Sequence, residues 1–180
     1  METSNDNFEI SVRPPFFKTA LEKAAVVTGV LIVFTMLLYL IDLHHSRWIA
    51  SISFILMLVL VFSFAKSYAQ SARTEVFTYG QAFRFLMAIF FLSALMSAVF
   101  NYIYFLYIAP ETIDMAIEEA YENLMKSGMS EEKAMEIMGM QMMWMNPLSF
   151  AATAAISTVL FGLLASLVIA VFIKHEPKSL

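Results

Sequence analysis

The sequence contains no cysteine and little charge. Only 14% of its 180 residues are charged and 60% are hydrophobic, whereas a soluble domain is about half apolar and about a quarter charged. The absence of cysteine excludes disulfides, thiolate metal sites and cysteine nucleophiles. The net charge of −4 is small, and no basic patch of the kind that binds nucleic acid is present. The apolar excess therefore indicates a surface that faces lipid, with no nucleic-acid partner.

Four stretches of the chain lack any Asp, Glu, Lys, Arg or His. Even the shortest has 18 residues, which as a helix covers about 27 Å, enough to cross the hydrocarbon core of a bilayer. Lipid cannot hydrogen-bond exposed backbone groups, so segments of this length cross it as helices. The sequence therefore predicts an all-α membrane protein with four transmembrane helices. The four stretches are Ala24–Ile41, Trp48–Ala65, Phe85–Ala109 and Leu148–Ile173.

The basic residues are unevenly divided between the two sides of these spans. Eight Lys and Arg fall in the N-terminal arm, the loop of residues 66–84 and the tail, and three fall on the other side. Because cytoplasmic loops carry the excess of Lys and Arg, we expect both termini to be cytoplasmic. Acidic residues in the arm and the lack of a small-residue cleavage pattern favour a retained first span rather than a signal peptide.

The longest loop, residues 110–147, is acidic and rich in methionine, and its apolar residues recur at helical spacing. Gly128 predicts the end of one helix, Ser130 predicts the start of the next, and Pro147 is expected to end the latter. This loop is thus expected to form an external helical hairpin. The chain divides into a cytoplasmic arm (1–23), three spans with their loops (24–109), the hairpin (110–147), the fourth span (148–173) and a cytoplasmic tail (174–180).

The loop between the second and third spans, residues 66–84, is rich in Ser, Thr and Tyr. We expect the second helix to extend into it and the chain to turn near Gly80.

The strongest polar groups within a span are Ser93, Ser97 and Asn101, four residues apart on one helix face. Two interpretations remain open for this polar stripe: a polar path through the bilayer, or hydrogen bonds to a neighbouring helix, which such residues make more often. Because proton relays, ion pathways and voltage sensors use intramembrane ionisable groups and the spans contain none, a coupled transporter is disfavoured.

The fourth span has a small residue at every fourth position. Rows of small residues let membrane helices approach closely, which predicts a packing face. Two partners remain open for this face: another span of this chain, with the first or third favoured, or a helix of another chain. The residues are Ala154, Thr158, Gly162, Ser166 and Ala170.

Two groups of side chains could bind a metal, and in both the plainer explanation is favoured. Asp42, His44, His45 and Arg47 follow the first span. Adjacent histidines diverge and no fourth ligand is marked, so no metal site is expected there.

The hairpin methionines could be ligands for Cu(I) or could form a surface that binds a partner. Their three-to-four spacing instead favours the buried apolar face of a helix. These are Met135, Met138, Met142 and Met145.

Several short runs mark a family resemblance: Tyr79–Arg84, Asn101–Tyr104, Ala109–Glu111, Ser127–Glu132 and Asn146–Pro147. Across most of its length the chain resembles the membrane family catalogued as domain of unknown function 4199, found mainly in Bacteroidota. The resemblance implies the bacterial inner membrane, and it supplies no activity, catalytic residue or cofactor to carry over.

The sequence thus favours a non-enzymatic inner-membrane protein without a cofactor, acting as an accessory or assembly subunit. Its expected partners are the lipid bilayer and another membrane or envelope protein, or a second copy of itself. The alternative is a transport or channel protein, formed as an oligomer around the stripe of Ser93, Ser97 and Asn101.

Overall fold

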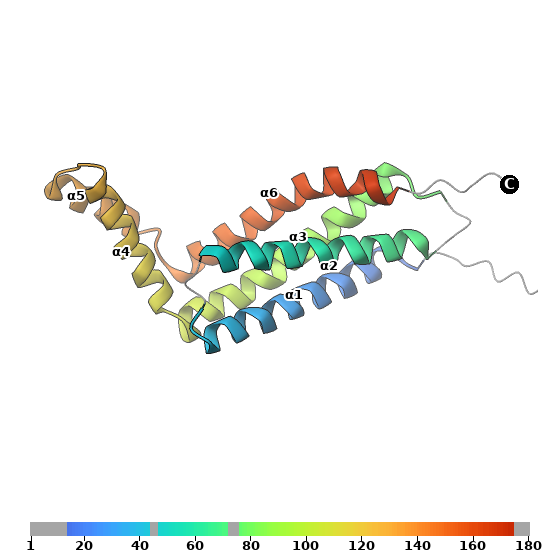
Figure 1. The fold of residues 1–180 in the computed structure, drawn as a ribbon, viewed down its shortest axis with the longest axis horizontal. Coiled ribbons are helices and arrows are strands. Elements are labelled where there is room, and N and C mark those ends of the chain that lie inside the picture. Colours follow the sequence, from blue (N-terminus) through green and yellow to red (C-terminus); the bar gives the residue numbers. More distant parts are fainter. Residues whose placement is uncertain (1–13, 44–46, 72–75, 175–180) are drawn as a thin grey trace, which may run out of the picture.

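The computed structural model describes residues 14–43, 47–71 and 76–174, and within them the fold is all-α (Figure 1). Six α-helices and one short π-helical segment, η1, make up the described chain. They are α1 (Phe16–Leu40), α2 (Arg47–Gln70), α3 (Tyr79–Ile103), η1 (Tyr104–Ile108), α4 (Glu111–Lys126), α5 (Glu131–Met142) and α6 (Pro147–Ile173).

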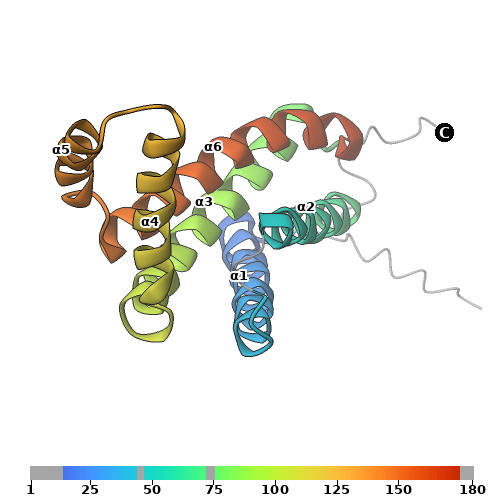
Figure 2. The same ribbon diagram turned by 60° about the vertical axis from the view of Figure 1, so that its left-hand side comes forward.

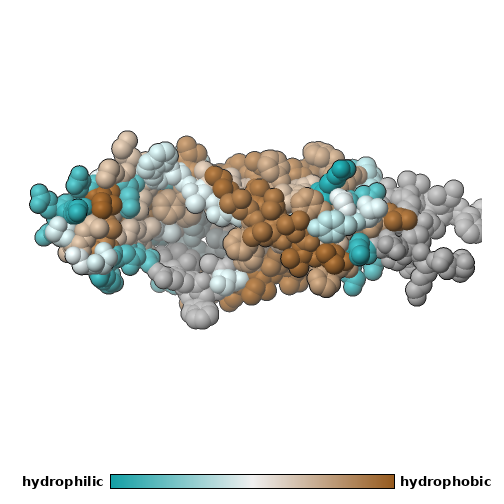
Figure 3. Space-filling model, turned by 90° about the horizontal axis from the view of Figure 1, so that it is seen from above, coloured by the Kyte–Doolittle hydropathy of each residue, from teal (hydrophilic) through white to brown (hydrophobic). Residues whose placement is uncertain are grey.

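Four of the helices are long and apolar enough to cross a membrane, which confirms the four predicted spans. In the most apolar window of each, only 17% to 33% of the residues are buried inside the protein. A hydrophobic helix with so much free surface requires an apolar solvent around it. Figure 3 shows a broad hydrophobic area over the spans, with hydrophilic residues gathered at the hairpin and near the other end.

The spans lie side by side around α3, which contacts α1, α2 and α6 (Figures 1 and 2). Its contact with α6 is the most extensive in the molecule. Helices α4 and α5 pack together as a hairpin that projects beyond one end of the bundle, here called the hairpin end. Helix α1 begins and α6 ends at the opposite, terminal end (Figure 1). The predicted helical hairpin between the third and fourth spans is thereby confirmed.

The turn before α3 lies earlier than Gly80, which corrects the prediction for this loop. Thr78 caps the helix: its hydroxyl accepts a hydrogen bond from the backbone N–H of Gln81, whose side chain accepts one from the N–H of Thr78. This reciprocal pair satisfies donors at the helix start and places Gly80 inside the first turn. The expected extension of the second span is present, since α2 continues to Gln70.

The hairpin boundaries follow the predicted signals except at its end. Gly128 has a positive φ of 81° after α4, and Ser130 directly precedes α5, as expected. Pro147, however, begins α6 instead of ending α5, which stops at Met142. The side chain of Asn146 accepts a hydrogen bond from the N–H of Ser149, and proline is well suited to a first helical position.

The main hydrophobic core of the described residues lies in the terminal half of the bundle. Phe85, Leu86, Ile89 and Phe90 of α3 are completely buried there. The buried residues of α1 all lie between Thr19 and Thr28, and none occurs from residue 31 to residue 40. The spans therefore leave space between them in the half nearer the hairpin.

Candidate functional site

The small-residue face of α6 lies against α3 over much of its length. A Cβ atom built at Gly162 would lie 2.5 Å from Cγ of Phe90, so the phenyl ring occupies the place of a side chain. Ser166 and Ala170 continue this face and are completely buried. Toward the hairpin end, Ala154 and Thr158 are only half-buried, because the two helices diverge there.

The polar stripe of α3 lies on the side of the helix that faces the other spans of this chain. Ser93 is completely buried, and its hydroxyl donates to the carbonyl oxygen of Ala24 on α1 at 3.4 Å. This bond matches the interhelical hydrogen bonding favoured from the sequence. Ser97 and Asn101, one and two turns further along, instead line a cavity.

This cavity, of about 500 Å³, is open to the outside and is lined by residues of all four spans. It brings the polar stripe of α3 together with Ala154 and Thr158 of the α6 small-residue face, which the sequence treated as separate features. None of the described residues that line it is charged, and apolar side chains such as Leu31, Met57 and Phe100 form much of its wall. Its polar lining residues are Thr35, Ser53, Ser97, Asn101, Ser157 and Thr158.

Sequence reasoning missed the cavity because its polar groups are dispersed over four helices. Thr35, Ser53 and Ser157 are polar residues within the spans, and their presence there could have indicated the cavity. Beside it, the third span ends in the π-helical segment η1, where the N–H of Ala109 donates to the carbonyl of Tyr104. Such segments occur frequently at functional sites.

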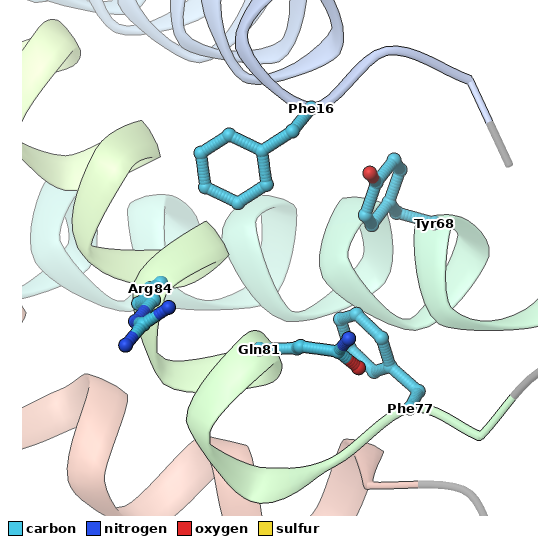
Figure 4. Close-up of a pocket in the computed structure, with 5 residues that line it drawn as sticks. All are labelled: Phe16, Tyr68, Phe77, Gln81 and Arg84. Carbon is cyan, nitrogen blue, oxygen red and sulfur yellow. The ribbon is translucent and has the colours of Figure 1, made fainter.

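A second pocket lies at the terminal end of the bundle (Figure 4). Phe16, Tyr68 and Phe77 supply its aromatic wall, and Gln81 and Arg84 supply its polar groups. Three of these side chains make contacts that hold the helices together. The Tyr68 ring stacks on the Phe85 ring with 3.9 Å between centroids, and the Tyr68 hydroxyl donates to the carbonyl of Pro14. Phe16 meets the same Phe85 ring edge-on, and Gln81 caps α3. Arg84 is exposed, as expected for a cationic side chain near the end of a membrane span.

The hairpin methionines do not form a buried face, which corrects the sequence interpretation. Only Met138 is buried, while Met135 and Met142 are 57% and 55% exposed. The reason is that α5, among the described elements, packs mainly against α4, which covers only a narrow stripe of it. The exposed side chains form what we call the methionine surface: Met135, Met140, Met142, Met143 and Trp144.

Within the described residues, no group of three His, Asp or Glu side chains is placed to hold a metal ion. Asp42 is described and adopts a positive φ of 55°. The candidate ligands His44 and His45 lie outside the described residues, as does the side chain of Arg47.

We expect no tight Cu(I) binding by the hairpin. Met138 is enclosed between α4 and α5 while Met135 and Met142 face outward, so their thioethers lie in different surroundings. A competition titration with Cu(I) should show no difference between the wild type and the variant with Leu at Met135, Met138, Met142 and Met145. Circular dichroism should show that both are folded, because Met-to-Leu exchange costs under about 1.5 kcal/mol per site. Tight binding that the folded variant loses would contradict this expectation.

Comparison with known proteins identifies a protein family for this chain. A family model described as "Protein of unknown function (DUF4199)" matches residues 23–175, which includes all four spans and the hairpin. No curated protein and no solved structure matches the chain. The match confirms the resemblance carried by the loop motifs, and the chain belongs to the DUF4199 family.

Proposed function

We propose that this chain is a non-enzymatic accessory or assembly subunit of the bacterial inner membrane, with both termini cytoplasmic. Its methionine surface would bind another membrane or envelope protein on the outer side. One observation carries the proposal: Met140, Met143 and Trp144 are 60%, 79% and 75% exposed although they belong to a hairpin that projects beyond the spans.

The chemistry of the methionine surface suits a protein partner. Methionine is unbranched and polarizable, so an exposed group of methionines can adapt to an apolar partner surface. Exposed apolar groups rimmed by polar residues are typical of interaction sites. Tryptophan is among the residues that contribute most to binding energy.

The charge of the hairpin selects among partners. Residues 110–147 carry eight acidic and two basic side chains, a net charge of −6. A second copy would bring the same charge to the contact, and like charges across an interface are unfavourable. The partner that fits is therefore a different protein, with an apolar patch bordered by Lys or Arg.

The orientation and the lack of catalysis rest on the sequence. The Lys and Arg distribution supports cytoplasmic termini. Four spans without ionisable residues and a chain without cysteine supply few groups for chemistry within the membrane.

The cavity between the spans favours transport as a second candidate function. A path through the bilayer would need to continue to the terminal end. In the described residues, Ser93, Phe90 and Ile89 are completely buried along the same helix and close the bundle beyond the cavity. Transport would thus require these residues to separate, and the subunit function requires no such movement.

Photo-crosslinking in native membranes tests the subunit function. A benzoylphenylalanine at Met140 should yield one discrete adduct with a different protein. The same group at Glu118, which is exposed on α4 outside the methionine surface, should yield little. Met143→Glu should weaken the Met140 adduct at least tenfold, because it places charge in an apolar contact, whereas Met143→Leu should preserve it. Equal adducts at both positions, or adducts only between copies of this chain, would overturn the proposal.

A further inference from the structure

The cavity between the spans continues toward the hairpin. A neighbouring cavity of about 420 Å³ is lined by Trp144 and Ser149, where α6 begins, and by Phe105 of η1. The two cavities share Ala154 and Ser157. Together they form a groove that leads from the start of α6 at the hairpin end to Ser97 of α3.

Three of the polar side chains along this groove have no hydrogen-bond partner within the described residues. Serine and threonine in a helix commonly donate to the carbonyl four residues earlier, as Thr158 does to Ala154 at 2.9 Å. The side chains of Thr35, Ser97 and Asn101 make no hydrogen bond within the described residues. All three side chains are half-buried, so their polar atoms stay accessible from the cavity. They therefore favour a ligand, or water, that supplies oxygen acceptors and donors.

The lining determines what kind of ligand fits. Among the described residues that line the two cavities, none is basic and could neutralise a phosphate or carboxylate, and none is acidic and could pair with a cation. Because burying an unpaired charge is very costly, this lining favours an uncharged ligand. Leu31, Met57 and Phe100 provide an apolar wall, and a volume of about 500 Å³ lies in the range of small-molecule sites.

We propose that this groove binds an uncharged, bilayer-soluble molecule whose hydroxyl or carbonyl oxygen hydrogen-bonds Asn101 and Ser97. Its apolar part lies along Leu31 and Met57. Such a molecule is already dissolved in the surrounding bilayer, and the groove reaches the start of α6 at the membrane surface, where Trp144 is well placed at its mouth. The groove is independent of the methionine surface except at Trp144, so either function can fail without the other.

The test uses a photoreactive aliphatic alcohol, azioctanol, with the full-length protein in lipid nanodiscs. Labelling should saturate and should map to peptides that contain Met57, Phe100 or Asn101. Excess unlabelled octanol should remove it, and competition by a monoacylglycerol or by a quinone would distinguish lipid alcohols from carbonyl compounds. Octanoate, which is charged at neutral pH, should compete at least tenfold less well than octanol.

Two variants and a control make the result specific. Asn101→Leu removes the deepest amide, and Ser157→Leu fills the junction of the two cavities from an exposed position. Either should reduce labelling at least fivefold, with unchanged circular dichroism. Val99→Leu, on the lipid-facing side of α3 at 63% exposure, should leave labelling unchanged. The proposal would be overturned if labelling does not saturate, spreads over lipid-facing residues, or persists in both folded variants. The groove would then be filled by water.

Discussion

Replacing Gly162 with Leu should separate α3 from α6 and lower the Tm of the purified protein in detergent. Even a Cβ at this position meets the Phe90 side chain at 2.5 Å, and Phe90 is completely buried, with little room to move. Overpacking of this kind costs about 1–3 kcal/mol, which corresponds to a fall in Tm of roughly 2–12 °C for a chain of this size.

Two further variants show whether the contact itself is responsible. Val168→Leu adds a similar side chain to the same helix, but Val168 is 60% exposed, so its Tm should stay near that of the wild type. Phe90→Ala should be destabilised alone, yet it should tolerate Leu at position 162 better than the wild type does, because the two sites are coupled. Equal effects of Leu at 162 and at 168 would show that the small-residue face has no special role.

The spans could be predicted from the sequence because the bilayer imposes one simple rule. Long stretches without charge have to be helical in lipid, and the four stretches correspond to α1, α2, α3 with η1, and α6. The small residues also indicated a packing face, since Gly162 allows an approach that no other residue permits. The sequence could not determine which helix makes that approach, because the lateral arrangement depends on all the packing contacts together.

Local capping decided the boundaries that were predicted wrongly. Proline is compatible with both the end of one helix and the first position of the next, and the Asn146 side chain resolves this ambiguity at Pro147 by capping α6. Similarly, the reciprocal hydrogen bonds of Thr78 and Gln81 draw Gly80 into α3. Such contacts act over three residues and are easily outweighed in sequence reasoning by a glycine or a proline.

The methionines show where periodicity alone misleads. Spacing of three and four residues predicts which side chains share a helix face, but burial also requires a neighbour to cover that face. Within the described residues, helix α5 packs mainly against α4, so Ala134 and Met138 are buried while Met135 and Met142 remain exposed. The same result that disproved the buried face provides the surface on which the proposed function rests.

We propose that the acidic, methionine-bearing hairpin lies outside the cell, opposite the loop between α2 and α3. Because the chain lacks cysteine, single cysteines can be introduced at Ser127, which follows α4, and at Ser71, which follows α2; both positions are exposed. Intact spheroplasts are treated with a membrane-impermeant maleimide, and permeabilised cells serve as the control for reactivity. Ser127→Cys is expected to be labelled in intact spheroplasts, and Ser71→Cys only after permeabilisation. The reverse pattern would place the hairpin in the cytoplasm and disprove this orientation.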